Sequence, residues 1–293
     1  MGKSVYNEKE YIIDIIKNVD LSKGDLWEKA LILDAVSEAM RMDKDECYKT
    51  FLDKELKNAM QNNLADFLIA NACYKSGGDM TEIAVNTAKR LKTQPRCEEG
   101  YFINEEGNKD LSAAFGILKF YMNYETKHGG KENYNDIIAQ FKAMHKDLFE
   151  SAKERLIKGE KKAFRAMALY AAGLIDTMEV MDQALYEIYA KLREFFKETV
   201  VAVSEEINTI EGEDAYKLIF AYAVFKGCRM NVLLTEKHEA AVLGIYENAA
   251  KNVADLKNKD MLYKGAFILA YSEFIKNREY QEYGRNRGGV LWN

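Results

Sequence analysis

Two kinds of predicted helix alternate along this chain, and the alternation restricts the folds open to it. The predicted helices at 111–124, 163–177, 215–226 and 262–275 are apolar on most sides, whereas an intervening one such as 183–198 has one apolar stripe and one charged face. A helix that is apolar all round must be buried, and a one-sided helix covers something along its stripe. Buried and half-buried helices in alternation therefore predict two concentric rings, because the helices of a plain bundle would all have similar exposure.

The stretch 218–225 shows the buried kind most clearly. Every residue in it is apolar or aromatic, and Gly227 follows as a typical helix stop. The segments 165–176 and 265–273 have the same texture and contain alanine or glycine where closely packed helices need small side chains. We expect these segments to belong to the inner ring.

The rest of the chain adds further helices and almost no strand. Apolar residues recur at helical spacing throughout, and the pattern breaks only between 93 and 108, where Pro95, Gly100 and Gly107 indicate a loop or short hairpin. A helical solenoid is the competing arrangement, but the tetratricopeptide pattern of roughly 34 residues is not visible. We therefore predict an all-α fold, an (α/α)6 toroid of about twelve helices. Further helices are expected near 11–16, 26–40, 47–60, 62–76, 81–92, 134–151 and 236–253.

Composition limits the possible partners. The chain has 293 residues with one proline and no linker-like segment, which favours one domain over 1–293 with 277–293 as a C-terminal extension. A net charge of −5 argues against nucleic acid as a partner.

Four scattered cysteines without CxxC spacing indicate free thiols, with no metal and no cofactor. The start lacks a signal-peptide pattern and no run approaches the roughly 20 apolar residues of a membrane span, so a soluble, cytoplasmic protein with no membrane partner is expected; the sequence leaves its oligomeric state open.

Four collinear segments resemble one family. They are Arg96 with the following 100–102, which is similar to a "PR…GgF" loop; 165–179, similar to "RGnGW…ALvDTLE"; 213–227, similar to "ESSasamFAYAlaKG"; and 265–273, similar to "GaFllAysE". These are motifs of the glycoside hydrolases of families 88 and 105, the unsaturated glucuronyl and rhamnogalacturonyl hydrolases. The resemblance implies an (α/α)6 toroid with a pocket for a small oligosaccharide.

The resemblance also implies an unusual reaction. In the family, an unsaturated uronic acid at the end of a pectin or glycosaminoglycan fragment is hydrated at its C4=C5 double bond. A carboxylic acid protonates the bond, water adds at C5, and the resulting hemiketal falls apart. Such a group must give and take a proton, so its pKa has to be raised by its surroundings.

At the acid and base positions the match is uneven. The first catalytic aspartate of the family corresponds to Asn62, an amide that cannot transfer protons, and the second has Asp110 as its plausible counterpart. The histidine of the pocket corresponds to Asn104. Asp110 is thus the candidate catalytic residue, and Asn62 and Asn104 are candidate substrate-binding residues. The alternative role for Asp110 is that of a helix N-cap.

Three further residues are candidates for substrate binding. Arg165 could hold a uronate carboxylate, Glu213 opens the segment 213–227, and Tyr170 could face a sugar. Each has a structural alternative: Arg165 could pair with Glu213, and Tyr170 could be a core residue. With Asn62, Asn104 and Asp110, the charged pair is expected at one end of the toroid, where helix starts converge.

Two hypotheses follow. Either the chain is a hydrolase of unsaturated uronides with Asp110 as acid and base, or it is a catalytically degenerate relative that serves as a carbohydrate-binding or scaffold protein.

Overall fold

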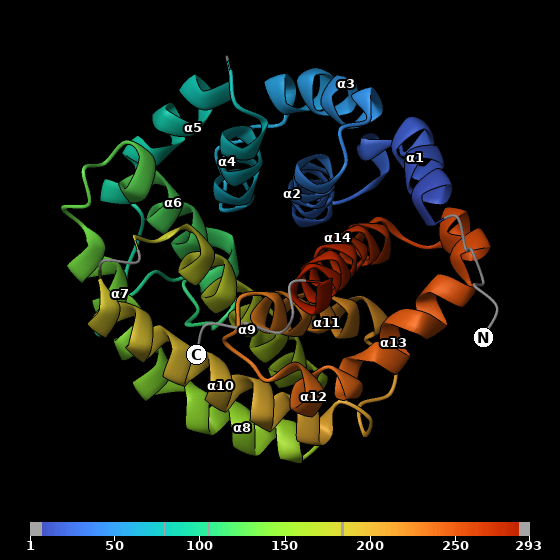
Figure 1. Ribbon diagram of the computed structural model, residues 1–293. Helices are drawn as coiled ribbons and strands as arrows, with labels where there is room; N and C mark the ends of the chain where they lie inside the picture. The colour runs from blue at the N-terminus through green and yellow to red at the C-terminus, as the bar shows by residue number, and fades with distance from the viewer. Residues whose placement is uncertain (1–7, 79, 105, 183–184, 287–293) are drawn as a thin grey trace.

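Six helices form a closed inner ring in the computed structural model, which describes residues 8–78, 80–104, 106–182 and 185–286. Each inner helix packs against the next, and the last packs against the first (Figure 1). The predicted all-α toroid is thereby confirmed. The inner helices are α2 (Leu26–Met42), α4 (Ala65–Ser76), α6 (Lys119–Lys127), α9 (Lys161–Val180), α11 (Asp214–Arg229) and α14 (Met261–Asn286).

An outer ring surrounds the inner one (Figure 1). Its helices bury one face and expose the other, as the charged stripes predict. In the described ranges there is no strand beyond one isolated bridge between Arg96 and Phe102, inside the predicted loop or hairpin. The outer helices are α1 (Glu8–Asn18), α3 (Glu46–Glu55), α5 (Met80–Ala88), α7 (Tyr134–Met144), α8 (Glu150–Ile157), α10 (Tyr186–Glu206), α12 (Thr235–His238) and α13 (Ala240–Lys251).

Shorter helical segments join these elements. Two of them are π-helical turns, η4 before α6 and η5 before α8. The other four are 3₁₀ turns. The segments are η1 (Leu21–Lys23), η2 (Leu56–Asn58), η3 (Lys89–Lys92), η4 (Ala114–Leu118), η5 (His145–Phe149) and η6 (Val253–Asn258).

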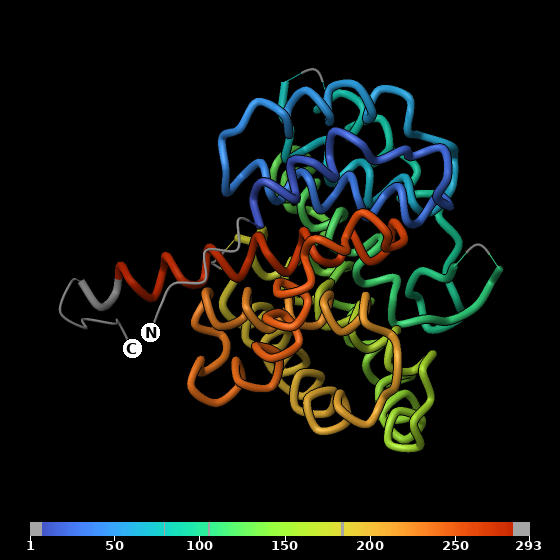
Figure 2. Tube along the Cα trace, turned by 90° about the vertical axis from the view of Figure 1, so that its right-hand side faces the viewer, coloured from blue at the N-terminus to red at the C-terminus, as the bar shows by residue number. Residues whose placement is uncertain are grey.

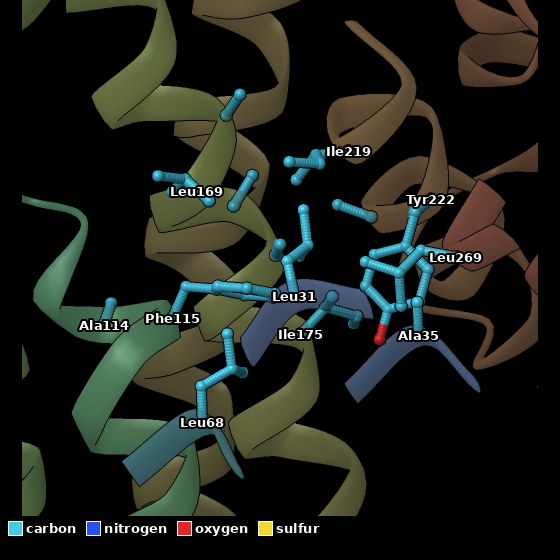
Figure 3. Packing of buried hydrophobic residues seen from close by; sticks show 14 of the residues in the cluster. Leu31, Ala35, Leu68, Ala114, Phe115, Leu169, Ile175, Ile219, Tyr222 and Leu269 are labelled. Carbon is cyan, nitrogen blue, oxygen red and sulfur yellow. The ribbon is translucent and has the colours of Figure 1, made fainter. Parts of the chain in front are cut away.

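Apolar side chains fill the centre of the inner ring. Figure 3 shows residues from α2, α4, η4, α9, α11 and α14 meeting one another, and all of those named here are at most 5% exposed. The centre of the inner ring therefore leaves no room for a ligand. The residues are Leu31, Leu68, Phe115, Leu169, Ile219 and Leu269.

The two ends of the toroid differ in what they present. At the end we call the helix-start end, Arg165 from the beginning of α9 contacts Glu213, which precedes α11. At the opposite, helix-finish end, Lys226 near the end of α11 contacts Glu179 near the end of α9. The inner helices α9 and α11 thus run in the same direction. Helix α14 projects away from the rings (Figure 2) and continues without a break across residue 277, where the sequence predicts an extension.

None of the helices in the described part of the chain has a stretch that is both long and apolar enough to cross a lipid bilayer.

Helix α2 begins at a complete capping box. The Asp25 carboxylate accepts a hydrogen bond from the Glu28 amide at 2.9 Å, and the Glu28 carboxylate accepts one from the Asp25 amide at 3.1 Å. Two amide groups that the helix cannot satisfy internally are paired in this way. The box fixes the first turn of an inner helix.

We expect Asp25→Ala to lower the free energy of unfolding by about 1 kcal/mol, the usual cost of losing an N-cap side chain. Urea unfolding followed by circular dichroism measures this loss. Asp25→Asn is the matched control, because asparagine caps helices about as well as aspartate. Equal losses in both variants would show that the negative charge matters here and the cap does not.

Candidate functional site

Arg165 and Glu213 form a two-pronged ion pair at the helix-start end. The Arg165 guanidinium donates from Nε and Nη2 to the two Glu213 carboxylate oxygens at 2.5 Å and 2.7 Å. Glu213 adopts a left-handed backbone conformation with φ of 58° immediately before α11. The pair lines a cavity of about 350 Å³ together with Tyr216 and Tyr263. The internal pairing that the sequence left open for Arg165 is present.

Asn62 and Asn104 lie together at a second cavity, of about 320 Å³. Asn62 is exposed and also has a left-handed backbone, with φ of 60°. The Asn104 carboxamide oxygen accepts hydrogen bonds from the amides of Glu106 and Asn108 at 3.1 Å and 2.7 Å, so it holds its own loop in place. Pro95 of the same loop also lines this cavity.

Asp110 lies between these two groups in the chain and is half-buried. Its carboxylate accepts a hydrogen bond from the Ser112 amide at 2.8 Å, a turn contact just ahead of η4. Burial raises the pKa of Tyr216, Arg165 opposes this, and the carboxylates of Glu213 and Asp110 add to it. Asp110 is therefore within electrostatic reach of the Arg165 cavity.

Tyr170 lies away from both cavities. It is fully buried on α9, and its hydroxyl is 3.3 Å from His145 Nδ1 in η5. The His145 ring stacks between Phe149 and Phe195, at centroid distances of 4.3 Å and 4.0 Å. Tyr170 thus contacts the outer ring, in the core role that the sequence left open, and in this structure it is not accessible to a sugar.

The largest constellation of charged groups lies at the helix-finish end and was not predicted. Contacts of 3.5 Å or less join it into one network to which all six inner helices contribute. The network has five carboxylates, Asp34, Glu38, Asp176, Glu179 and Glu273, and six basic groups, Arg41, Lys75, Lys119, Lys226, Arg229 and Lys276.

Two lysines form the centre of this network. Lys119, 1% exposed, contacts Asp34 at 2.8 Å and Asp176 at 3.1 Å. Lys226, also 1% exposed, contacts Asp176 at 2.7 Å and Glu179 at 2.9 Å. Buried charges persist only when they are paired and hydrogen-bonded; here Lys119 links α6 to both α2 and α9, and Lys226 links α11 to α9. The network therefore fixes how the inner helices lie relative to one another.

Three carboxylates of the network, Asp34, Glu38 and Glu179, have a lowered pKa and are held in their charged form. Burial alone would raise the pKa of Glu38, but Lys75, Lys226, Lys276 and Arg41 outweigh this and hold it well below its ordinary value. A carboxyl group in such surroundings is unsuited to donate a proton near neutral pH. Structural support is the role that these contacts indicate.

A signal for the network was present in the sequence. Lysine, aspartate and glutamate interrupt otherwise apolar inner helices, as at Asp176, Lys226 and Glu273. A charged residue in a helix that is buried all round needs a partner, so each predicts an internal ion pair. Motif comparison directed attention to the helix starts instead.

No metal site is evident within the described ranges. No group of three or more histidine, cysteine, aspartate or glutamate side chains is arranged to hold an ion. All four cysteines are unpaired. The described residues that line the two helix-start cavities present carboxylate, guanidinium, ammonium, amide and tyrosine side chains.

Three solved structures that this chain resembles are two glycoside hydrolases and a polysaccharide lyase. A family 105 glycoside hydrolase from C. acetobutylicum ATCC 824 superposes with a TM-score of 0.70 at 19% identity, covering 91% of this chain and 98% of that one. A polysaccharide lyase superposes with a TM-score of 0.64 at 11% identity, covering 93% and 98%. A family 88 glycosyl hydrolase from Bacteroides vulgatus superposes with a TM-score of 0.59 at 12% identity, covering 92% and 99%.

Comparison of the sequence alone finds no relative. No protein-family model matches the chain, and no curated protein matches it significantly. The structural likeness spans nearly the whole chain and includes both families that the motifs resemble. The chain has the (α/α)6 fold of the family 88 and 105 glycoside hydrolases, as the resemblance implied.

Proposed function

We propose that this chain is a carbohydrate-binding protein built on a glycoside hydrolase fold, with little or no hydrolytic activity. The fold supports a carbohydrate ligand. The observation that carries the proposal is that both candidate carboxylates at the helix-start end are committed to structural contacts. Asp110 holds a turn, and Glu213 is paired with Arg165.

These contacts oppose acid catalysis. A general acid must be protonated before it can donate, and a two-pronged guanidinium contact stabilises the charged carboxylate instead. Arg165 likewise uses two of its donor nitrogens on Glu213, which leaves less of the guanidinium for a uronate. With Asn62 in place of a proton-transferring residue, no pair of acid and base remains among the candidates.

The cavity beside Arg165 suits a sugar ring. Tyr216 and Tyr263 each supply an aromatic ring with a cation over one side, Arg165 and Lys259 respectively, while Asp214 and Asp260 supply acceptors for hydroxyl groups. Ligand sites commonly combine apolar or aromatic walls with a few polar groups that fix orientation. The three carboxylates at this cavity, Glu213, Asp214 and Asp260, outnumber its two basic groups, Arg165 and Lys259, and this favours a neutral sugar unit over a uronate.

We expect no turnover of unsaturated uronyl disaccharides above background, followed as loss of the absorbance of the double bond. Calorimetry should instead detect binding of neutral oligosaccharides. Tyr216→Ala should weaken that binding about three- to tenfold, the range for one aromatic contact. Tyr186→Ala is the matched control, because that side chain is 70% exposed on the outer ring.

A second candidate function is hydration of unsaturated uronides by Asp110, favoured by its electrostatic effect on Tyr216 in the wall of the Arg165 cavity. Turnover that Asp110→Asn abolishes would establish this hydrolase function and overturn the binding-protein proposal. Turnover that survives the substitution would place the acid elsewhere, with Glu213 the next residue to test. Absence of both turnover and saccharide binding would overturn both functions.

A further inference from the structure

A separate cavity of about 250 Å³ lies at the helix-finish end, next to the charged network. It is smaller than the roughly 300–1,000 Å³ of typical ligand pockets, so its size suits one small ring and not an oligosaccharide. Its lining includes the basic residues Arg41, Lys75 and Lys127, the polar residues Tyr74 and Asn123, and three carboxylates of the network, Glu38, Asp176 and Glu179.

Two basic side chains at this cavity, Arg41 and Lys127, have donor groups that no described residue uses. Arg41 contacts Glu38 and Glu179 through Nη1 alone, at 3.3 Å and 3.5 Å, which leaves Nε and Nη2 without a partner in the described structure. Lys127 makes no ion pair with any described residue and lies over the Tyr74 ring, 5.1 Å from its centroid. The carboxylates nearby are already shared among the six basic groups of the network.

Besides burial, the other positive charges at this cavity lower the pKa of Lys127. Burial lowers the pKa of its ammonium group, and the like charges of Arg41 and Lys75 lower it further. An anion placed between Arg41 and Lys127 would relieve that repulsion.

Two buried polar groups at the same cavity also lack partners. Tyr74 is 6% exposed and Asn123 is 1% exposed, yet Tyr74 Oη and Asn123 Oδ1 make no hydrogen bond with the described residues. Asn123 donates to Asn71 at 2.9 Å, and Asn71 donates in turn to Asp34 at 3.0 Å. This chain fixes the Asn123 amide with its acceptor oxygen left over. Leaving buried polar atoms without partners is costly, so a polar group that pairs with them would be stabilising.

We propose that this cavity binds a small hydroxylated anion, a sugar acid or a sugar phosphate. Arg41 and Lys127 hold the anionic group, and the hydroxyl groups of the ligand face Asn123 and Tyr74 in the wall of the cavity. The site is at the opposite end of the toroid from the Arg165 cavity, so it stands or falls independently of the function proposed above.

Calorimetry with glucuronate, glucose 6-phosphate and glucose tests this assignment. We expect at least one of the two anions to bind and glucose to bind at least about tenfold more weakly, since it lacks the group held by charge-assisted hydrogen bonds. Comparison of the two anions identifies the carboxylate or the phosphate as the preferred group. Affinity should fall as salt rises, because Lys127 lies at the surface.

Variants separate this site from the other end of the molecule. Lys127→Ala and Arg41→Gln should each weaken anion binding about tenfold or more, and Lys127→Arg should retain most of it. Lys251→Ala, an exposed lysine on α13, and Arg165→Ala should leave it unchanged. Circular dichroism confirms that each variant is folded, and Arg41→Gln provides a second test if Lys127→Ala is not.

Three results would overturn the proposal. The first is that neither anion binds. The second is that glucose binds as tightly as the anions. The third is that Arg165→Ala removes binding while Lys127→Ala and Arg41→Gln leave it intact, which would place the anion at the helix-start end.

Discussion

Replacing Lys226 by methionine is expected to lower the free energy of unfolding by about 3–5 kcal/mol, the usual cost of removing one partner from a buried ion pair. The Lys226 ammonium contacts Asp176 at 2.7 Å, Glu179 at 2.9 Å and the Tyr222 hydroxyl at 2.7 Å, at a position only 1% exposed. Methionine fills a similar volume but leaves two carboxylates without this cation. The loss comes from uncompensated buried charge and not from a cavity.

Urea unfolding measures the loss, and an exposed pair provides the control. Lys191 contacts Glu194 at 2.9 Å on α10, with side chains 37% and 53% exposed. Exposed pairs contribute little, so Lys191→Met should change the free energy of unfolding by no more than about 0.5 kcal/mol. A Lys226→Met variant within about 1 kcal/mol of the parent would show that the network adds little to stability.

The fold could be predicted because the signal for it is local. A helix such as 215–226 is apolar on every side, and this shows burial without knowledge of its neighbours. Burial alternates with half-burial along the chain, and concentric rings are the arrangement that this alternation requires. The structure confirms this prediction, with α11 in the inner ring and α10 in the outer one.

The network could be anticipated residue by residue but not as a whole. Asp34 and Lys119 are 85 positions apart in the chain and are brought to 2.8 Å by the closure of the ring. A charged residue in a buried helix predicts some partner, but the sequence cannot say which of several candidates it meets. The sequence also could not predict which way the Tyr170 side chain points. A helix that is apolar on all sides has no polar stripe to distinguish its inner face from its outer face.

At the helix-start end, the sequence predicted residues that do lie together. It did not predict which of them contact one another. Arg165 and Glu213 were candidate ligand-binding residues, with mutual pairing as the alternative, and they are paired. Side-chain chemistry shows what a residue can bind, whereas spatial neighbours decide what it does bind. Only the folded structure shows that the carboxylates of Asp110 and Glu213 already have partners at the helix-start end, whereas Arg41 and Lys127 keep unused donors at the helix-finish end.

Gly173→Ala is expected to lower the free energy of unfolding by about 3 kcal/mol, at the upper end for an overpacked core. Gly173 lies on α9 where that helix meets the π-helical turn η4 most closely. An alanine Cβ there would lie 2.4 Å from the Ala114 carbonyl carbon and 2.5 Å from the Phe115 nitrogen. Both are backbone atoms, so no side chain can rotate away, and the two inner helices must separate.

Separation would also act on the charged network. Lys119 follows η4 directly, and Asp176 lies one turn beyond Gly173 on α9, so the 3.1 Å contact between them spans the same interface. Pushing α9 away from η4 lengthens that contact while both groups stay buried. The expected loss therefore combines overpacking with weakened pairing of buried charges.

Gly244→Ala is the matched control, and its effect should have the opposite sign. Gly244 lies within α13 of the outer ring, and nothing lies within 4 Å of an added Cβ. Alanine at an unhindered helical position should raise the free energy of unfolding by about 0.5–1 kcal/mol. If Gly173→Ala instead stabilised the protein as Gly244→Ala does, α9 and η4 could not approach as closely as described, and the inner ring would be more loosely packed at this point than its buried side chains indicate.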